Sequence, residues 1–160
     1  MLRICWSALV GARHGRDFSN LFVLRETKVE GSVATFISVD AEAELEVLAR
    51  FELTAHGVLK VSQQVTNLGF TEYRVDGITT FLPVPDYTKA VLDFHGRWMR
   101  ERQPQRQEIR VGTWLREGRE GRTGHDATTI QFAMAESSTF EHGEVWGLSL
   151  AWSGNSRQLV

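Results

Sequence analysis

The sequence is poor in cysteine and has no long apolar run, and each shortage excludes a class of protein. Of its 160 residues only Cys5 is a cysteine, so an intrachain disulfide and a cysteine-based zinc cluster are both excluded. No run of about 18 apolar residues exists, so no membrane-spanning helix is predicted. The opening apolar stretch is too short, and followed by too many charges, for a signal peptide. A chain without disulfides suits a reducing compartment, and we expect a cytoplasmic protein.

Bulky side chains that require burial are, in contrast, abundant. Hydrophobic residues make up 42% of the chain, with five tryptophans and nine phenylalanines, while charged residues make up 24% and nearly cancel to a formal net charge of −2. This composition is typical of a soluble globular protein. The chain shows no linker, internal repeat or low-complexity tract, so we expect residues 1–160 to form a single domain.

Alternation with a period of two is the dominant pattern and predicts β-strands. In residues 45–53, Leu, Val, Ala, Phe and Leu alternate with mostly charged side chains, and residues 59–66 repeat the alternation after a turn at Gly57. Two such runs across a short turn predict a hairpin within a β-meander that spans Leu21–Val84.

A second hairpin is predicted between residues 127–136 and 145–154, with Trp146 and Trp152 together on its core face. No long amphipathic helix is present, and residues 86–94 have room for at most one helical turn. The sequence therefore predicts an all-β protein, an antiparallel β-sandwich with little or no helix.

The segment from His95 to His125 concentrates positive charge, with eight arginines between Arg97 and Arg122. Clustered arginine beside tryptophan is one pattern of nucleic-acid binding. Carboxylates interleave with these arginines, however, and the whole chain is slightly acidic, so we expect no nucleic-acid partner. The arginines are better explained by pairing with carboxylates and backbone carbonyls along a long connection.

A series of short pieces with a fixed order and spacing runs from residue 87 to residue 155. They are Gly96-Arg97-Trp98, Glu101-Arg102, Arg106, Gly112, Glu117, Gly121-Arg122-Thr123, His125, Gly143-Glu144-Val145 and Trp152-Ser153-Gly154-Asn155. In this order and spacing the segment resembles the N-terminal domain of family 36 α-galactosidases. Gly118, Glu120 and Gly124 depart from the family pattern, which has serine, arginine and serine at those places.

This resemblance implies a supersandwich of the galactose-mutarotase kind that precedes a catalytic barrel. The family's two catalytic aspartates lie on the barrel, which takes about 250 residues, more than this whole chain has. We therefore expect no catalytic residue here, and an inactive fragment of a larger hydrolase that cleaves terminal α-D-galactosides with retention. The implied partners are the barrel, further copies in a homo-oligomer, and a galactoside at the mouth of the pocket. We expect no cofactor.

Two other functions stay open from the residues themselves. A free-standing carbohydrate-binding module would also be a compact, aromatic-rich sandwich. A mutarotase-like sugar epimerase would need an acid and a base, for which His95, His125 and Glu117 are the candidates. No two histidines have the spacing of a ligand pair, so no metal site is predicted. The residues expected to contact carbohydrate or to form an interface are Arg97, Trp98, Arg102, Arg119, Arg122, His125, Trp152 and Asn155.

Overall fold

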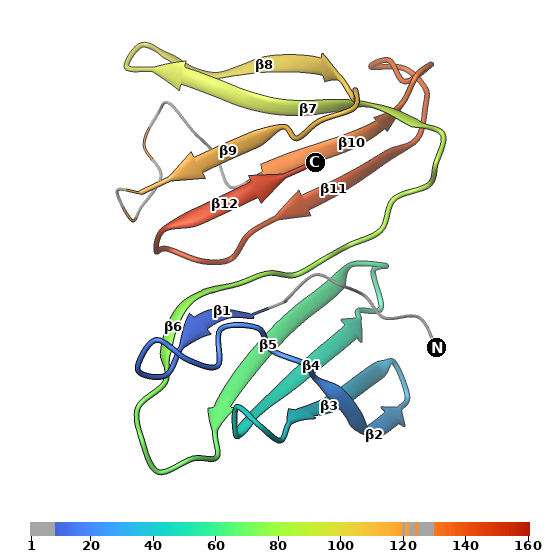
Figure 1. Cartoon of the computed structure of the whole chain (residues 1–160). Coiled ribbons are helices and arrows are strands. Elements are labelled where there is room, and N and C mark those ends of the chain that lie inside the picture. Colours follow the sequence, from blue (N-terminus) through green and yellow to red (C-terminus); the bar gives the residue numbers. More distant parts are fainter. Residues whose placement is uncertain (1–8, 120, 122–123, 125–129) are drawn as a thin grey trace. The chain divides into compact units, whose positions relative to one another are not determined.

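The computed structural model describes residues 9–119, 121, 124 and 130–160. These residues form twelve strands and no helix, and every pair of strands is antiparallel (Figure 1). The predicted all-β antiparallel fold is confirmed. In the described part of the chain, no helix is long and apolar enough to cross a membrane. The chain divides into two compact units, unit 1 (Met1–Leu82) and unit 2 (Pro83–Val160). The single domain stays a prediction.

Unit 1 contains one four-stranded and one two-stranded sheet. The predicted hairpin is confirmed, with Leu45 opposite Asn67 and Leu53 opposite Leu59. The predicted meander ends earlier than expected, because the sixth strand leaves the sheet and pairs with the first. The four-stranded sheet runs in chain order through β2 (Val23–Glu30), β3 (Val33–Asp40), β4 (Leu45–Leu53) and β5 (Leu59–Asn67), and the second sheet pairs β1 (Leu9–Ala12) with β6 (Arg74–Ile78).

The core of unit 1 joins these two sheets. Leu9 from β1 and Leu45 from β4 are fully buried together with Ala43, and Val65 and Tyr73 pack against them. Burying a leucine side chain contributes about 1.5–3 kcal/mol, so Leu9 and Leu45 supply much of the free energy that holds the two sheets of unit 1 together.

Buried polar side chains fix the loops of unit 1 around this core. The guanidinium of Arg13 donates to the Ala43 carbonyl at 2.8 Å and to Asn67 Oδ1 at 2.9 Å. The Asp40 carboxylate accepts backbone N–H groups from Leu21 at 2.7 Å and Ala43 at 3.0 Å. Each buried charge thus has hydrogen-bond partners, as burial requires.

Unit 2 also contains a four-stranded and a two-stranded sheet. The predicted second hairpin is confirmed, with Ile130 opposite Ser149 and Met134 opposite Val145. Residues 86–94 do not form a helical turn, because from Thr88 onward they belong to a strand that pairs on both sides. The larger sheet has the order β11 (Val145–Ser149), β10 (Ile130–Ala135), β7 (Thr88–Arg97), β8 (Arg100–Glu108), and the smaller one pairs β9 (Leu115–Gly118) with β12 (Ser156–Leu159).

The two-stranded sheet of unit 2, which we call the β9–β12 ribbon, is tied to the larger sheet by a buried ion pair. Asp93 on β7 is 1% exposed, and its Oδ2 pairs with Nη2 of Arg116 on β9. Gln158 on β12 lies opposite Arg116 and is also buried. The contact between ribbon and sheet is therefore polar at its centre.

Candidate functional site

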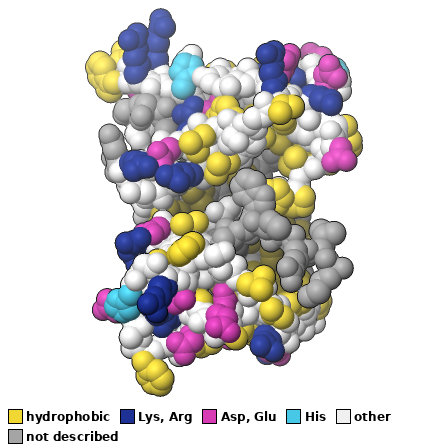
Figure 2. All heavy atoms as spheres, viewed as in Figure 1, with side chains coloured by type: hydrophobic (Ala, Val, Ile, Leu, Met, Phe, Trp, Pro, Cys, Tyr) yellow, Lys and Arg dark blue, Asp and Glu magenta, His cyan; other side chains and the backbone are white. Residues whose placement is uncertain are grey.

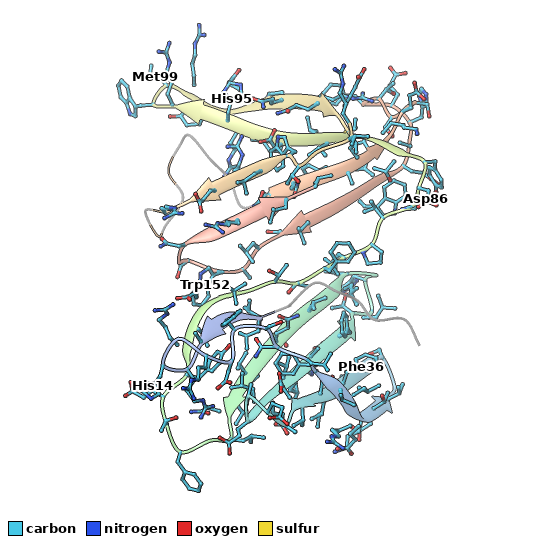
Figure 3. All side chains as sticks on the ribbon, in the orientation of Figure 1. His14, Phe36, Asp86, His95, Met99 and Trp152 are labelled. Carbon is cyan, nitrogen blue, oxygen red and sulfur yellow. The ribbon has the colours of Figure 1, made fainter. Side chains whose placement is uncertain are left out.

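The β7–β8 hairpin ends in an exposed turn that we call the hairpin tip (residues 97–102). Arg97 pairs with Arg100 across the turn, and Trp98 and Met99 between them are 75% and 72% exposed. Met99 adopts a φ of 67°, and its N–H donates to Glu101 Oε1 at 2.9 Å. A left-handed conformation at a non-glycine residue costs about 1–3 kcal/mol and persists where the surroundings hold it. Figure 3 labels Met99 at this tip.

The hairpin tip combines apolar and basic side chains. Arg97, Arg100 and Arg102 are all exposed, and none has an ion pair with a residue in the described part of the chain. Figure 2 shows dark blue and yellow side chains together at this end of β7 and β8. Tryptophan, methionine and arginine are enriched at protein interfaces, so the composition suits a contact with another surface.

A second group of predicted residues lies where the turn after β11 meets the end of β9. Trp152 donates its indole Nε1–H to the Asn155 carbonyl at 3.2 Å, and Asn155 Oδ1 accepts the Gly121 N–H at 3.3 Å. Trp152 is 63% exposed, which corrects its predicted place in the core with Trp146. Because β11 ends at Ser149, the alternation no longer holds at Trp152. Trp146 is half-buried and meets Tyr87 edge to face.

Glu117 joins two arginines on the outer side of the β9–β12 ribbon. It accepts from Arg119 Nε at 3.0 Å and from Arg157 Nε at 2.5 Å. The hydrogen bond from Arg119, followed by that from Arg157, lowers the pKa of Glu117, and Glu117 in turn raises the pKa of Arg119. A carboxylate held ionised in this way is a poor general acid and a weak base, which argues against the epimerase role considered for Glu117.

The predicted site residues thus fall into two places rather than one. Arg97, Trp98 and Arg102 belong to the hairpin tip. The second place is the end of the β9–β12 ribbon with Arg119, Trp152 and Asn155, which we call the ribbon-end cluster together with Glu117 and Arg157. Arg122 and His125 lie outside the described residues, and His95 is exposed on β7 opposite Gln103.

Two features of this region could not be found by sequence reasoning. The Glu117–Arg157 contact joins residues 40 positions apart, and the Asp93–Arg116 pair joins two different sheets. No spacing rule connects such residues, because their proximity depends on which strands pair. Among the described residues, no group of three or more His, Cys, Asp or Glu side chains is placed to hold a metal ion.

Comparison with protein families gives one match that spans the described strands. The model of the glycosyl hydrolase family 36 N-terminal domain matches residues 9–160. An alpha-galactosidase of Escherichia coli is 33% identical over 149 residues, which are 93% of this chain and 21% of that protein. The alpha-galactosidase AgaA of Geobacillus stearothermophilus is 27% identical over 144 residues, 80% of this chain and 20% of that protein. The chain therefore spans about a fifth of the length of these curated relatives.

Solved structures share the fold. The crystal structure of the GH36 alpha-galactosidase AgaB from Geobacillus stearothermophilus matches 98% of this chain and 24% of that chain, with a TM-score of 0.85 at 18% identity. The galactosidase domain of an alpha-galactosidase-sucrose kinase, AgaSK, matches 95% of this chain and 24% of that chain, with a TM-score of 0.84 at 19% identity. At these identities the likeness concerns the fold alone.

Proposed function

Because the chain belongs to the family of glycosyl hydrolase family 36 N-terminal domains, we propose that it is the non-catalytic N-terminal part of a longer α-galactosidase. The observation that carries this proposal is the family match over residues 9–160, in a chain that spans only 21% of the E. coli relative. The longer protein would hydrolyse terminal α-D-galactosides with retention. Its two catalytic carboxyl groups would lie on a barrel outside these residues.

The roles of the carboxylates within the described residues support this division of labour. Asp40 accepts backbone N–H groups, Asp93 pairs with Arg116, and Glu117 is held between two arginines. A retaining glycosidase needs one carboxylate free to attack the sugar and one carboxylic acid poised to donate a proton. These three carboxylates are instead engaged in holding loops, sheets and the ribbon together.

We further propose that the domain supports the catalytic barrel and takes part in a homo-oligomer, with the hairpin tip as a contact between subunits. Trp98 and Met99 provide apolar surface, and Arg97, Arg100 and Arg102 provide donors for carboxylates and carbonyls. Exposed tryptophan and arginine often dominate binding energy when a partner covers them. A cytoplasmic location completes the proposal and is supported by the single cysteine.

The test compares the turnover of an aryl α-galactoside by the 160-residue chain and by the longer protein that contains it. We expect turnover by the longer protein alone. A mock preparation from cells that do not express the chain, taken through the same purification, serves as the blank for contaminating hydrolase. Activity in the chain that persists through a second purification step, in constant proportion to protein, would overturn the proposal.

A further inference from the structure

The turn that joins β10 to β11, which we call the acidic turn (residues 136–144), presents a phenylalanine to solvent. Phe140 at its tip is fully exposed. The same turn has three exposed glutamates, Glu136, Glu141 and Glu144, and no lysine or arginine. An exposed aromatic ring with a polar border has the composition of a protein contact surface.

Hydrogen bonds hold the acidic turn in one conformation. The Thr139 N–H donates to the His142 carbonyl at 2.7 Å. Arg106 on β8 donates from its two Nη atoms to the carbonyls of Ser138 and Glu136, both at 3.0 Å. The ring at the tip of the turn is therefore presented by a fixed backbone, and covering it costs little entropy of loop ordering.

The acidic turn and the hairpin tip lie at opposite ends of one sheet. β10 is antiparallel to β7, with Phe132 opposite Leu92 and Ala135 opposite Thr88. The acidic turn therefore follows the end of β10 that lies beside the start of β7, whereas the hairpin tip follows the end of β7 (Figure 1). The 10 residues of β7 span about 30 Å, so the two surfaces of one copy cannot touch each other.

The two surfaces are complementary in charge. The hairpin tip has three arginines and one glutamate, and the acidic turn has three glutamates. Within the described part of the chain none of these three glutamates has an ion pair. Each surface also presents an exposed aromatic ring, Trp98 on the tip and Phe140 on the turn. Opposite charges steer association and fix its orientation, and aromatic rings that become covered supply much of the binding energy.

We propose that the acidic turn of one copy receives the hairpin tip of a second copy, so that copies associate head to tail. The inference rests on the proposed function, because it names the surface that meets the hairpin tip in the homo-oligomer. Contact between two hairpin tips would bring arginines together, which like charges oppose. A contact between two different surfaces builds a closed ring or an open chain of copies, whereas a surface that contacts itself stops at a pair.

The small size of the contact sets its strength. An aromatic side chain buries about 150–250 Å², so one ring and its border stay below the roughly 800 Å² that each partner buries in a stable interface. The 160-residue chain should therefore associate weakly and reversibly, and added salt should weaken the association by screening the charges. In the longer protein, further contacts would strengthen this one by avidity.

The experiment follows the association of the 160-residue chain by sedimentation velocity over a range of concentrations. A tip variant carries Trp98→Ala with Arg100→Gln, and a turn variant carries Phe140→Ser with Glu141→Gln. Self-association of each variant alone should weaken at least about tenfold. An equimolar mixture of the two should form a one-to-one pair and no larger species, because each variant keeps the surface that the other lacks. Phe70→Ser is the matched control, because Phe70 is equally exposed in unit 1 and its loss should leave association unchanged.

Each outcome decides the proposal, and a dispersed amide spectrum checks that the variants, whose altered side chains are all exposed, are folded. A one-to-one pair in the mixture, with association lost in each variant alone, supports head-to-tail contact. An unaltered chain that stays monomeric at about 1 mM overturns it. A turn variant that associates as strongly as the unaltered chain also overturns it, and if the tip variant alone loses association, the proposed role of the hairpin tip stands without this inference. Turnover by the longer protein tests the parent activity separately.

Discussion

The ion pair between Asp93 and Arg116 should be the main tie between the β9–β12 ribbon and the rest of unit 2. A two-stranded sheet is marginal on its own, and this one has only four residues in each strand. Removing one partner of a buried ion pair costs about 3–5 kcal/mol, because the other charge stays buried without compensation. Asp93 is 1% exposed whereas the Arg116 side chain is 19% exposed.

This difference in burial predicts unequal effects of two conservative substitutions. Arg116→Met keeps most of the aliphatic stem but leaves the carboxylate of Asp93 buried without a partner charge. It should therefore lower the free energy of unfolding by about 3–5 kcal/mol, the range for a broken buried ion pair. Asp93→Asn leaves the guanidinium of Arg116 unpaired, but this side chain is partly exposed and its charge can be hydrated. Asp93→Asn should therefore lower the free energy of unfolding by less than Arg116→Met does. The double variant should cost less than the sum of the single variants, since no uncompensated charge remains.

Urea unfolding of the three variants measures these free energies, and hydrogen exchange locates the loss. The amides of the ribbon should exchange faster in Arg116→Met, while those that pair β10 with β11 should keep their protection. The explanation would be refuted if Arg116→Met cost less than about 1 kcal/mol, or if the two single effects simply added.

Three further predictions concern other parts of the two units. Gly11→Ala would place a Cβ against the Arg74 carbonyl and 2.6 Å from Tyr73 Cε1, so it should lower the free energy of unfolding by about 1–3 kcal/mol. Gly77→Ala in the same sheet is the control, because its Cβ meets nothing within 4 Å, and it should lower the free energy of unfolding by less than about 1 kcal/mol. Equal urea midpoints of the two variants would contradict this prediction. The pKa of the Glu117 carboxyl should lie below its usual range in an NMR titration and should rise in Arg157→Gln, and an unchanged pKa in that variant would contradict the contact. Because the pKa is lowered in the folded chain, the stability that Glu117 adds is present above the unfolded pKa and is lost as the pH falls through the folded pKa. Trp98→Ala should change the stability of the chain by less than about 0.5 kcal/mol but weaken self-association of the longer protein in sedimentation, and unchanged association would remove the hairpin tip from the interface.

Strand prediction from the sequence succeeded where one face of a strand is exposed to solvent and failed where both faces are buried. The alternation in β4 and β5 predicted their hairpin correctly. In β7, Ala90, Val91 and Leu92 are consecutive apolar residues, and the first two are both buried on opposite faces. A central strand covered on both sides has no period of two, so residues 86–94 could not be distinguished from a helical turn.

Strands that are short, or that pair with a strand far away in the sequence, could not be predicted either. β1 and β6 are separated by the whole meander, and β9 and β12 have too few residues for a period to be recognised. The place of Trp152 was mispredicted for a related reason, since the alternation was carried past Ser149, where β11 ends. Most of the candidate site residues came from a family resemblance, which names residues but not their contacts. The hydrogen bond from the Trp152 indole to the Asn155 carbonyl depends on a turn conformation that no residue pattern specifies.

The alternating sides of β9 link the buried tie to the exposed cluster. Arg116 points inward to Asp93, and its neighbour Glu117 points outward to Arg157 on the paired strand. The inward contact holds the ribbon on the larger sheet, and the outward contact stands at the ribbon end, where Asn155 directly precedes β12. Asp93 holds the ribbon through Arg116, and the turn with Trp152 and Asn155 leads directly into the ribbon strand β12. The packing of one short ribbon should therefore determine where this turn stands on unit 2.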